Sequence, residues 1–288
     1  MSGDLGAARL VVSRSGAPGR PIEVLGDGHS TVGGITINAD QVVVRGFIVV
    51  GGQAPGIWLR GAGITVQDNT VRHPTGGNFD GIQFFGTDLK ILHNTISDID
   101  ADSSGGSADC LQTYDSPAAI PDPSGLSVPA PARGNQCDIH PNCMQTFATG
   151  PNSPVPDTGP SQRVLIEANR CQRIAERCLI AQGPHSRAGS GAGHGQSSKI
   201  TFINNYCDAH GSSAVLVDDV QDVTIRGNEI DGTEYDADKG VFKAFAFAKN
   251  STHATVEDNR LASGVRYEVG MDDSSRPGYT GPTPVGIP

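Results

Sequence analysis

Short segments of alternating apolar and polar residues recur along the chain, and the three clearest copies lie at 80–85, 109–114 and 142–147. Each begins with Asp or Asn, has an apolar residue at its third position and carries Gln at its fourth. Side chains alternate across a β-strand, so the third and fifth positions are predicted to face a common interior. More divergent copies extend the third-position column to Ile57, Ile82, Leu111, Met144, Leu179, Val215 and Phe245. The fifth-position column is Leu59, Phe84, Thr113, Thr146, Ala181, Val217 and Phe247.

A second alternating segment ends in Asn and lies between copies of the first. Its copies end at Asn69, Asn94, Asn169, Asn205, Asn228 and Asn259. Asn tolerates left-handed backbone geometry and its amide can bond neighbouring groups. The Asn residues are therefore predicted to sit at a sharp turn and to bond one another from coil to coil. Asn135 is predicted to be a degenerate copy that fills the widest gap.

Two columns that keep register at a spacing of about 25 residues predict coils of three short strands, which is the pattern of a β-helix. Over about residues 31 to 265 the chain resembles the right-handed parallel β-helix proteins of the pectin-lyase-like group. We therefore expect an all-β chain with one domain, the parallel β-helix, over 31–269. Residues 1–30 are predicted to form an N-terminal cap with the first strands, and 270–288 an extended or disordered tail.

Charge and hydropathy exclude some partners. The net charge of −10 leaves no basic stripe for nucleic acid. No run of about 20 apolar residues exists, so no membrane span is predicted. Residues 1–8 lack the basic and apolar pattern of a signal peptide, so the chain is either cytosolic or trimmed. We expect a monomer.

Pro- and Gly-rich insertions at 115–134, 148–162 and 183–198 follow the Gln-containing strands. Long insertions on one face of a solenoid commonly carry function, so they are predicted to wall a groove. Its floor would hold aromatic rings that pack on sugars and amides that bond hydroxyl groups. Alternatively, the stacked identical side chains only stabilise the fold. One outward column is Trp58, Gln83, Gln112 and Gln145, and the next is Arg60, Phe85, Tyr114, Phe147, Gln182 and Asp218.

Asp80 and Asp109 begin two copies that the pattern places on adjacent coils, with Asn142 and then Arg177 next. Neighbouring strands lie about 4.8 Å apart, so the two carboxyl groups are predicted to be close. Two like charges at short range raise one pKa, which suits a general acid. The same pair could instead bind Ca²⁺ or cap turn amides.

The segments 78–82 and 108–111 also resemble the Asn-x-Asp-Gly and Asp-Asp-Cys motifs of polygalacturonase-type glycoside hydrolases. The resemblance implies that Asp80 and Asp109 take the places of catalytic carboxylates. Ala108 stands where that family has a further Asp. Gly193-His194-Gly195 is similar to the family's Gly-His-Gly motif but lies in an insertion, and the Arg-Ile-Lys motif is missing.

The predicted function is therefore cleavage of glycosidic bonds in a polysaccharide, with hydrolysis favoured because of the Asp pair. The alternatives are a uronide lyase or epimerase and a non-catalytic glycan-binding or structural module. Tyr114 and His185 are further candidate catalytic residues, and Arg177 and Lys243 join the outward aromatic and amide residues as candidate substrate ligands. The sequence contains no set of four ligands at the spacing of a zinc site, so zinc is not predicted. No cofactor is expected unless Ca²⁺ binds.

The six cysteines fall into two columns of three. Cys137, Cys171 and Cys207 follow the Asn positions and are predicted to face inward, whereas Cys110, Cys143 and Cys178 precede the apolar column and are predicted to face outward. Pairing within a column would leave one thiol over in each. Buried free thiols are the alternative. Disulfides would indicate an extracellular protein, in keeping with the resemblance.

Overall fold

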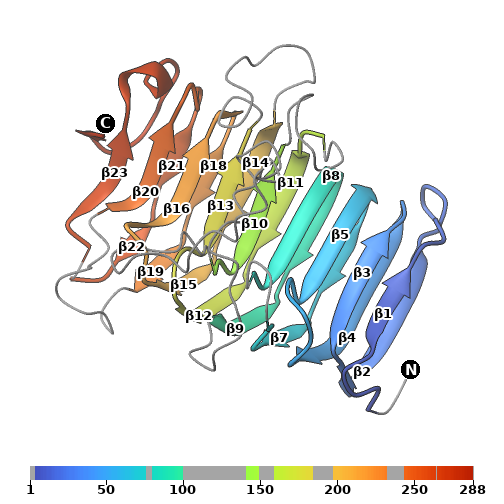
Figure 1. Cartoon of the computed structure of the whole chain (residues 1–288). Coiled ribbons are helices and arrows are strands. Elements are labelled where there is room, and N and C mark those ends of the chain that lie inside the picture. The colour runs from blue at the N-terminus through green and yellow to red at the C-terminus, as the bar shows by residue number, and fades with distance from the viewer. Residues whose placement is uncertain are drawn as a thin grey trace, which may run out of the picture.

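The computed structural model describes residues 4–75, 80–99, 141–148, 159–183, 197–231, 243–263 and 265–287. In this part of the chain the secondary structure is β-strand apart from one 3-10 helix, η1 (Asp273–Ser275). The strands stack as successive coils from the N-terminus at one end to the C-terminal segment at the other (Figure 1). Every ladder between strands is parallel, and the ladders form three stacks that we call sheets 1, 2 and 3.

Sheet 1 contains the strands predicted from the Gln-containing segments. Each strand pairs in register with its counterpart in the neighbouring coil. In chain order they are β1 (Arg9–Val12), β3 (Gly34–Asn38), β5 (Ile57–Ala62), the first half of β8 (Ile82–Leu92), β10 (Met144–Phe147), β13 (Leu179–Gln182), β16 (Ser213–Asp218), β20 (Lys243–Ala248), β23 (Tyr267–Met271) and β24 (Val285–Gly286).

Sheets 2 and 3 complete each coil. β2 (Ile22–Val32) and β4 (Val42–Val50) run from sheet 2 into sheet 3, and β8 runs from sheet 1 into sheet 2. Sheet 2 continues with β6 (Thr65–Gln67), β11 (Gln162–Glu167), β14 (Ser197–Ile203), β17 (Val220–Gln221), β18 (Thr224–Arg226) and β21 (Thr255–Glu257). Sheet 3 continues with β7 (Thr70–Arg72), β9 (Thr95–Ile99), β12 (Arg170–Ile174), β15 (Tyr206–Ala209), β19 (Glu229–Asp231) and β22 (Arg260–Leu261).

The predicted interior columns are confirmed where the structure describes them. Ile57 pairs with Ile82 and Ile82 pairs with Met144, and the column continues through Leu179, Val215 and Phe245, all fully buried. Leu111 lies outside the described residues. Because β8 pairs directly with β10, no strand separates Ile82 from Met144 in this structure, in contrast to the predicted order.

A ladder of buried Asn side chains runs along the stack, as predicted. Each Nδ2 donates to the Oδ1 of the next Asn at 3.0–3.1 Å, through Asn69, Asn94, Asn169, Asn205, Asn228 and Asn259. Asn135 lies outside the described residues, and Asn94 bonds Asn169 directly. The prediction that the Asn itself turns left-handed is wrong. The positive φ belongs to the preceding residue, as at Asp68 (φ 53°) and Asn204 (φ 55°), which leaves the Asn amide free to point along the stack.

Two disulfides, Cys143–Cys171 and Cys178–Cys207, each join the start of a sheet-1 strand to the sheet-3 strand of the same coil. Each bridge therefore joins one cysteine column to the other, a pairing that the sequence left open. Cys143 and Cys178 are also fully buried rather than outward-facing. They precede β10 and β13 in the turn, where the side-chain alternation of the strand does not apply. Cys110 and Cys137 lie outside the described residues.

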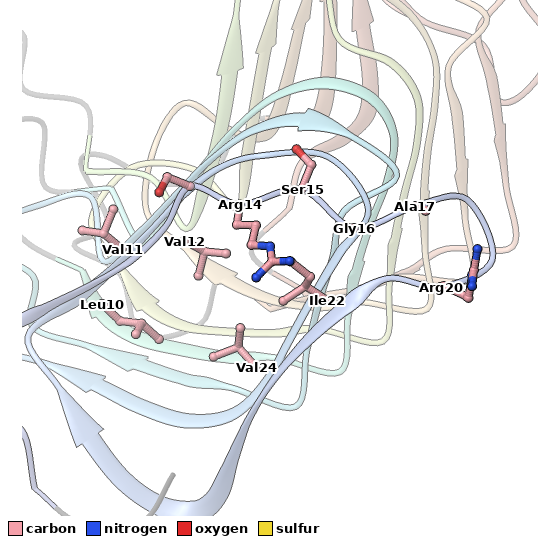
Figure 2. Close-up of a pocket in the computed structure, with 11 residues that line it drawn as sticks. Leu10, Val11, Val12, Arg14, Ser15, Gly16, Ala17, Arg20, Ile22 and Val24 are labelled. Atoms are coloured by element: carbon pink, nitrogen blue, oxygen red, sulfur yellow. The ribbon is translucent and has the colours of Figure 1, made fainter.

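The two ends of the stack differ. At the N-terminal end β1 and β2 form a first coil whose apolar side chains, including Leu10, Val12, Ile22 and Val24, line an open hollow (Figure 2). At the other end, residues 270–287 do not form the extended or disordered tail that the sequence predicts. They include η1 and β24, and the Tyr279 ring packs 6.4 Å from that of Phe247. This segment therefore covers the last coils.

Candidate active site

The turn from sheet 3 into sheet 1 gathers polar side chains in four coils. We call it the site corner and define it as residues 80–81, 141–143, 175–178 and 208–213. Backbone hydrogen bonds hold its rungs together, from Gly81 N to Asn142 O at 2.9 Å and from Cys143 N to Arg177 O at 2.8 Å. Gly81 allows this close stacking, because a Cβ there would lie 2.7 Å from the carbonyl oxygen of Cys143.

Asp80 is the most strongly perturbed acid of the site corner. Its side chain is fully buried, yet both carboxyl oxygens have partners. Oδ1 accepts from the backbone N (3.1 Å) and Nδ2 (3.2 Å) of Asn142, and Oδ2 accepts from Gln83 Nε2 at 2.6 Å. Burial raises the pKa of the Asp80 carboxyl from 3.8 to about 7, and these hydrogen bonds act in the opposite direction. Asp80 can therefore donate or accept a proton near neutral pH.

The predicted neighbour of Asp80 is not the one that the structure places there. β8 lies between β5 and β10, and the position beside Asp80 on the β10 side holds Asn142. Within the described part of the chain, burial rather than a second carboxylate raises the pKa of Asp80. The candidates Asp109, Gln112, Tyr114 and His185 all lie outside the described residues.

The outward columns keep their predicted register but not their predicted exposure. Gln83 pairs with Trp58 and Gln145, and its Nε2 donates to Gln145 Oε1 at 3.3 Å. The rings of Trp58, Phe85 and Phe147 follow one another at centroid distances of 5.9 and 4.9 Å. Gln83, Phe85, Gln145 and Phe147 are 5%, 1%, 4% and 4% exposed. The sequence predicts that these side chains form the exposed floor of a groove, but in the structure they are buried.

Arg177 lies where the pattern predicts, one coil beyond Asn142. Its Nη1 is 3.3 Å from Glu176 Oε2 and its Nη2 donates to Ser212 Oγ at 3.4 Å. Lys243 is not brought to Asp80. It pairs with Ser213 and Tyr267 at the start of β20, four strands from β8 and hence about 19 Å away along the stack.

The sequence analysis missed two residues of the site corner, Asp208 and His210. His210 Nε2 lies 3.6 Å from Asp208 Oδ1, and Asp208 Oδ2 accepts from the backbone N of Arg173 at 3.0 Å. Both side chains are largely buried, at 9% exposure for Asp208 and 13% for His210. The neighbouring Cys207 was the available signal, because a disulfide at that position ties Asp208 to the site corner.

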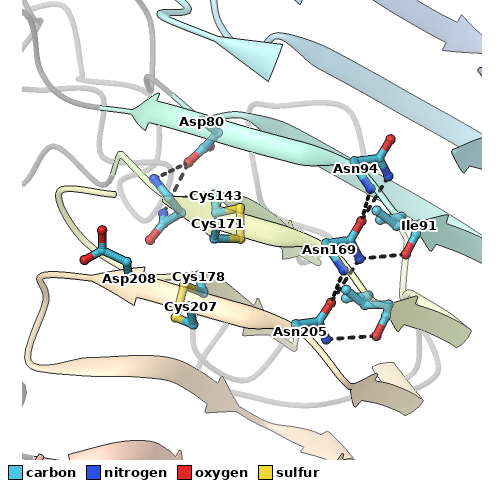
Figure 3. The surroundings of a disulfide bond; sticks show 12 residues. Asp80, Ile91, Asn94, Cys143, Asn169, Cys171, Cys178, Asn205, Cys207 and Asp208 are labelled. Carbon is cyan, nitrogen blue, oxygen red and sulfur yellow. Dashed lines mark hydrogen bonds between the residues drawn. A yellow bond between two sulfur atoms is a disulfide. The ribbon is translucent and has the colours of Figure 1, made fainter. Parts of the chain in front are cut away.

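The two disulfides hold the site corner in place. Figure 3 shows both bridges, Cys143–Cys171 and Cys178–Cys207. In the chain Cys143 follows Asn142, Cys178 follows Arg177, and Cys207 precedes Asp208. Asn142, Arg177 and Asp208 are thus each adjacent in sequence to a cysteine whose disulfide joins sheets 1 and 3. The described residues contain no group of three or more His, Cys, Asp or Glu side chains that could hold a metal ion. In the same part of the chain, no helix is long and apolar enough to cross a membrane.

A family model described as right handed beta helix region matches residues 158–281. The predicted fold, an all-β right-handed parallel β-helix, is therefore confirmed. No curated protein sequence matches the chain.

Among solved structures, the A-module of the mannuronan C-5 epimerase AlgE6 from Azotobacter vinelandii is similar at 12% identity and a TM-score of 0.43, over 90% of this chain and 61% of that module. An alginate lyase from Paenibacillus sp. str. FPU-7 is similar at 12% identity and a TM-score of 0.42, over 91% and 89%. The catalytic unit of a GH87 α-1,3-glucanase from Streptomyces thermodiastaticus is similar at 18% identity and a TM-score of 0.32, over 88% of this chain and 48% of that chain. These likenesses concern the fold.

Proposed function

We propose that the chain is a polysaccharide-active enzyme that cleaves glycosidic bonds across the outer face of sheet 1, with Asp80 as the proton donor. The observation that carries this proposal is the buried carboxyl of Asp80, whose pKa is raised to about 7. A carboxylic acid that remains partly protonated at neutral pH is what protonation of a glycosidic oxygen requires.

The outer face would supply the sugar contacts. Gln83 links Asp80 to this face, since its amide donates to Oδ2 of Asp80 and also to Gln145. When the Gln83 amide turns to a sugar hydroxyl, Oδ2 of Asp80 becomes available to the substrate. Trp58, which is only partly buried, offers a ring surface for the sugar C–H groups. Asp109 remains the proposed second carboxylate, with Tyr114 and His185 as proposed helpers, and Gln112 and Lys243 remain proposed substrate ligands.

A uronide lyase or epimerase is the second candidate, and the rest of the site corner favours it. Both reactions begin when a base removes the proton beside a carboxylate that a cation neutralises. Arg177 supplies a cation, and His210, oriented by Asp208, supplies a base in the adjoining coil. In this mechanism Asp80 donates the proton to the leaving oxygen or returns it to the sugar carbon.

A non-catalytic glycan-binding module is the candidate from another class. The hydrogen bond from Gln83 to Gln145 favours a non-catalytic or structural module, because these two amides then stabilise the stacking of the coils rather than take part in a reaction. For either role we propose an oxidising, extracellular compartment, since both described disulfides are fully buried structural links.

The deciding experiment follows a panel of neutral and uronic polysaccharides by release of reducing ends and by the ultraviolet absorbance of unsaturated uronides. Asp80→Asn keeps the shape of the side chain but cannot lend a proton, so we expect cleavage to fall by at least about 100-fold. The matched control is Asp273→Asn, which removes a carboxylate that is 99% exposed and should leave the rate unchanged.

The two signals separate the candidates. Reducing ends without absorbance indicate hydrolysis, and absorbance that rises with them indicates elimination. Epimerisation changes neither signal and is followed by exchange of the sugar C5 proton with deuterated solvent. Wild-type cleavage by Asp80→Asn would contradict the role of Asp80, and binding without any of these reactions would leave the glycan-binding module.

A further inference from the structure

A second ionisable group lies on sheet 1 away from the site corner, at the opposite ends of the strands. Asp218 is the last residue of β16, and it pairs with Gln182 of β13 and Ala248 of β20. It belongs to the outward column that also contains Phe85 and Phe147. An aspartate at the outer end of a strand is ordinarily solvated, yet Asp218 is only 5% exposed.

The two oxygens of the Asp218 carboxyl differ in their hydrogen bonds. Oδ2 lies 3.1 Å from Nζ of Lys249, and Gln182 also hydrogen-bonds the carboxyl group. Oδ1 is buried but has no hydrogen-bond partner among the described residues. A carboxylate oxygen without a partner costs free energy, so this position calls for a donor that the described residues do not supply.

Access to the pair comes from the Lys249 side. The Lys249 side chain is 55% exposed, compared with 7% for that of Asp218, so the ion pair lies at the border between the outer face and solvent. The neighbouring Asp219 is fully buried and raises the pKa of the Asp218 carboxyl further, after the larger effect of burial. The Lys249 ammonium and the hydrogen bond from Gln182 lower the pKa of the Asp218 carboxyl and so oppose both effects.

The charges decide what kind of ligand fits. A metal cation would meet the ammonium of Lys249, and an acidic sugar would meet the carboxylate of Asp218. A neutral diol avoids both conflicts, because one hydroxyl donates to the Asp218 carboxyl from the Lys249 side and the next accepts from Lys249 Nζ. We infer that Asp218 and Lys249 form a subsite for the hydroxyl groups of a neutral sugar unit, an inference that rests on the proposed action on a glycan.

The test measures binding by titration calorimetry in an Asp80→Asn background, which prevents turnover. The probes are neutral oligosaccharides of glucose, mannose and galactose and, beside them, oligouronates. Asp218→Asn removes the carboxylate at nearly constant volume, and Lys249→Met removes the ammonium from a half-exposed chain. We expect each change to weaken binding of the neutral probes about tenfold or more. Glu257→Gln is the control, because it removes the carboxylate of an exposed ion pair on sheet 2.

Unchanged affinity for the neutral probes in folded Asp218→Asn and Lys249→Met would overturn the inference while leaving the proposed function standing. A chain that binds only oligouronates, equally well with and without Asp218, would overturn it too. A chain that binds no carbohydrate at all would contradict both the inference and the proposed function. Circular dichroism establishes folding, and Lys249→Met keeps the test decisive if Asp218→Asn does not fold.

Discussion

Asp80 shows how one residue couples the fold to acid–base chemistry. Its carboxyl accepts three hydrogen bonds, which favour the ionised form, but it has no contact with solvent, which favours the neutral form. Burial outweighs the hydrogen bonds, and the pKa rises to about 7. Asn142 and Gln83 therefore position the acid without holding it ionised.

The raised pKa of Asp80 predicts a pH dependence of stability. The folded state binds the proton more tightly than the unfolded state, so the contribution of Asp80 is fully present below about pH 4. It is lost as the pH rises through about 7, and we expect it to amount to a few kcal/mol. Denaturant unfolding between pH 4 and 8 measures this change as the difference between the wild type and Asp80→Asn.

Asp80→Asn introduces an amide donor, which shifts its stability by an amount that does not vary with pH. The slope of the difference against pH is therefore the informative quantity. A difference that stays constant from pH 4 to 8 would contradict the raised pKa.

At the scale of elements, the disulfides connect strands that no backbone ladder joins. Cys143–Cys171 links the turn before β10 to β12, and Cys178–Cys207 links the turn before β13 to β15. These strands belong to sheets 1 and 3, whose main contact is otherwise the packing of apolar side chains in the interior. The two disulfides thus add covalent links to the packing that holds sheets 1 and 3 together beside the site corner.

Removal of one disulfide should destabilise the chain measurably. The residues Cys143 and Cys171 are 28 apart, and loop-closure entropy for such a span corresponds to about 3.5 kcal/mol. We expect Cys143→Ser/Cys171→Ser to lose roughly this much in the free energy of unfolding, measured in urea. The same double variant should lower activity at Asp80, because Asn142 directly precedes Cys143. Full stability and activity in the double variant would show that packing alone holds the site corner.

The overall fold was largely predictable because each coil of a solenoid repeats the same pattern of buried and exposed residues. The columns through Ile82 and through Asn169 fix strand register in coil after coil, and a one-residue slip would expose every apolar residue in the column. The site was less predictable. The neighbour of Asp80 depends on which coil follows β8. Asp80 and Asn142 are 62 positions apart, and the sequence pattern between them does not show that their coils are adjacent.

Side-chain orientation in turns was equally hard to predict. Alternation fixes which way a strand residue points, but Cys143 and Asp208 lie at or beside a corner where the chain bends. Exposure also depends on the whole molecule, so that Gln83 and Phe85 face outward and are nevertheless buried. Local pattern thus gave the register of these residues and could not give their surroundings.

At the scale of the whole molecule, the Asn ladder should contribute to cooperative unfolding. Asn169 accepts from Asn94 and donates to Asn205 and to the Ile91 carbonyl. We expect Asn169→Ala to lower the free energy of unfolding by about 3 kcal/mol, because several buried partners lose their bonds. Asn259→Ala, at the partly exposed end of the ladder, should cost about half as much. Equal losses in urea unfolding would argue against a cooperative ladder.

The geometry of the Asn ladder does not depend on how many residues lie between successive Asn positions. Its steps span 23 residues from Asn205 to Asn228, 36 from Asn169 to Asn205 and 75 from Asn94 to Asn169. The Nδ2 to Oδ1 distance is 3.0–3.1 Å in each of them. An insertion between two rungs therefore leaves the hydrogen bonds of the scaffold intact, and its sequence can drift or be exchanged at little structural cost. Such a protein can acquire new specificity by recombination of the segments between rungs while its backbone frame is inherited unchanged.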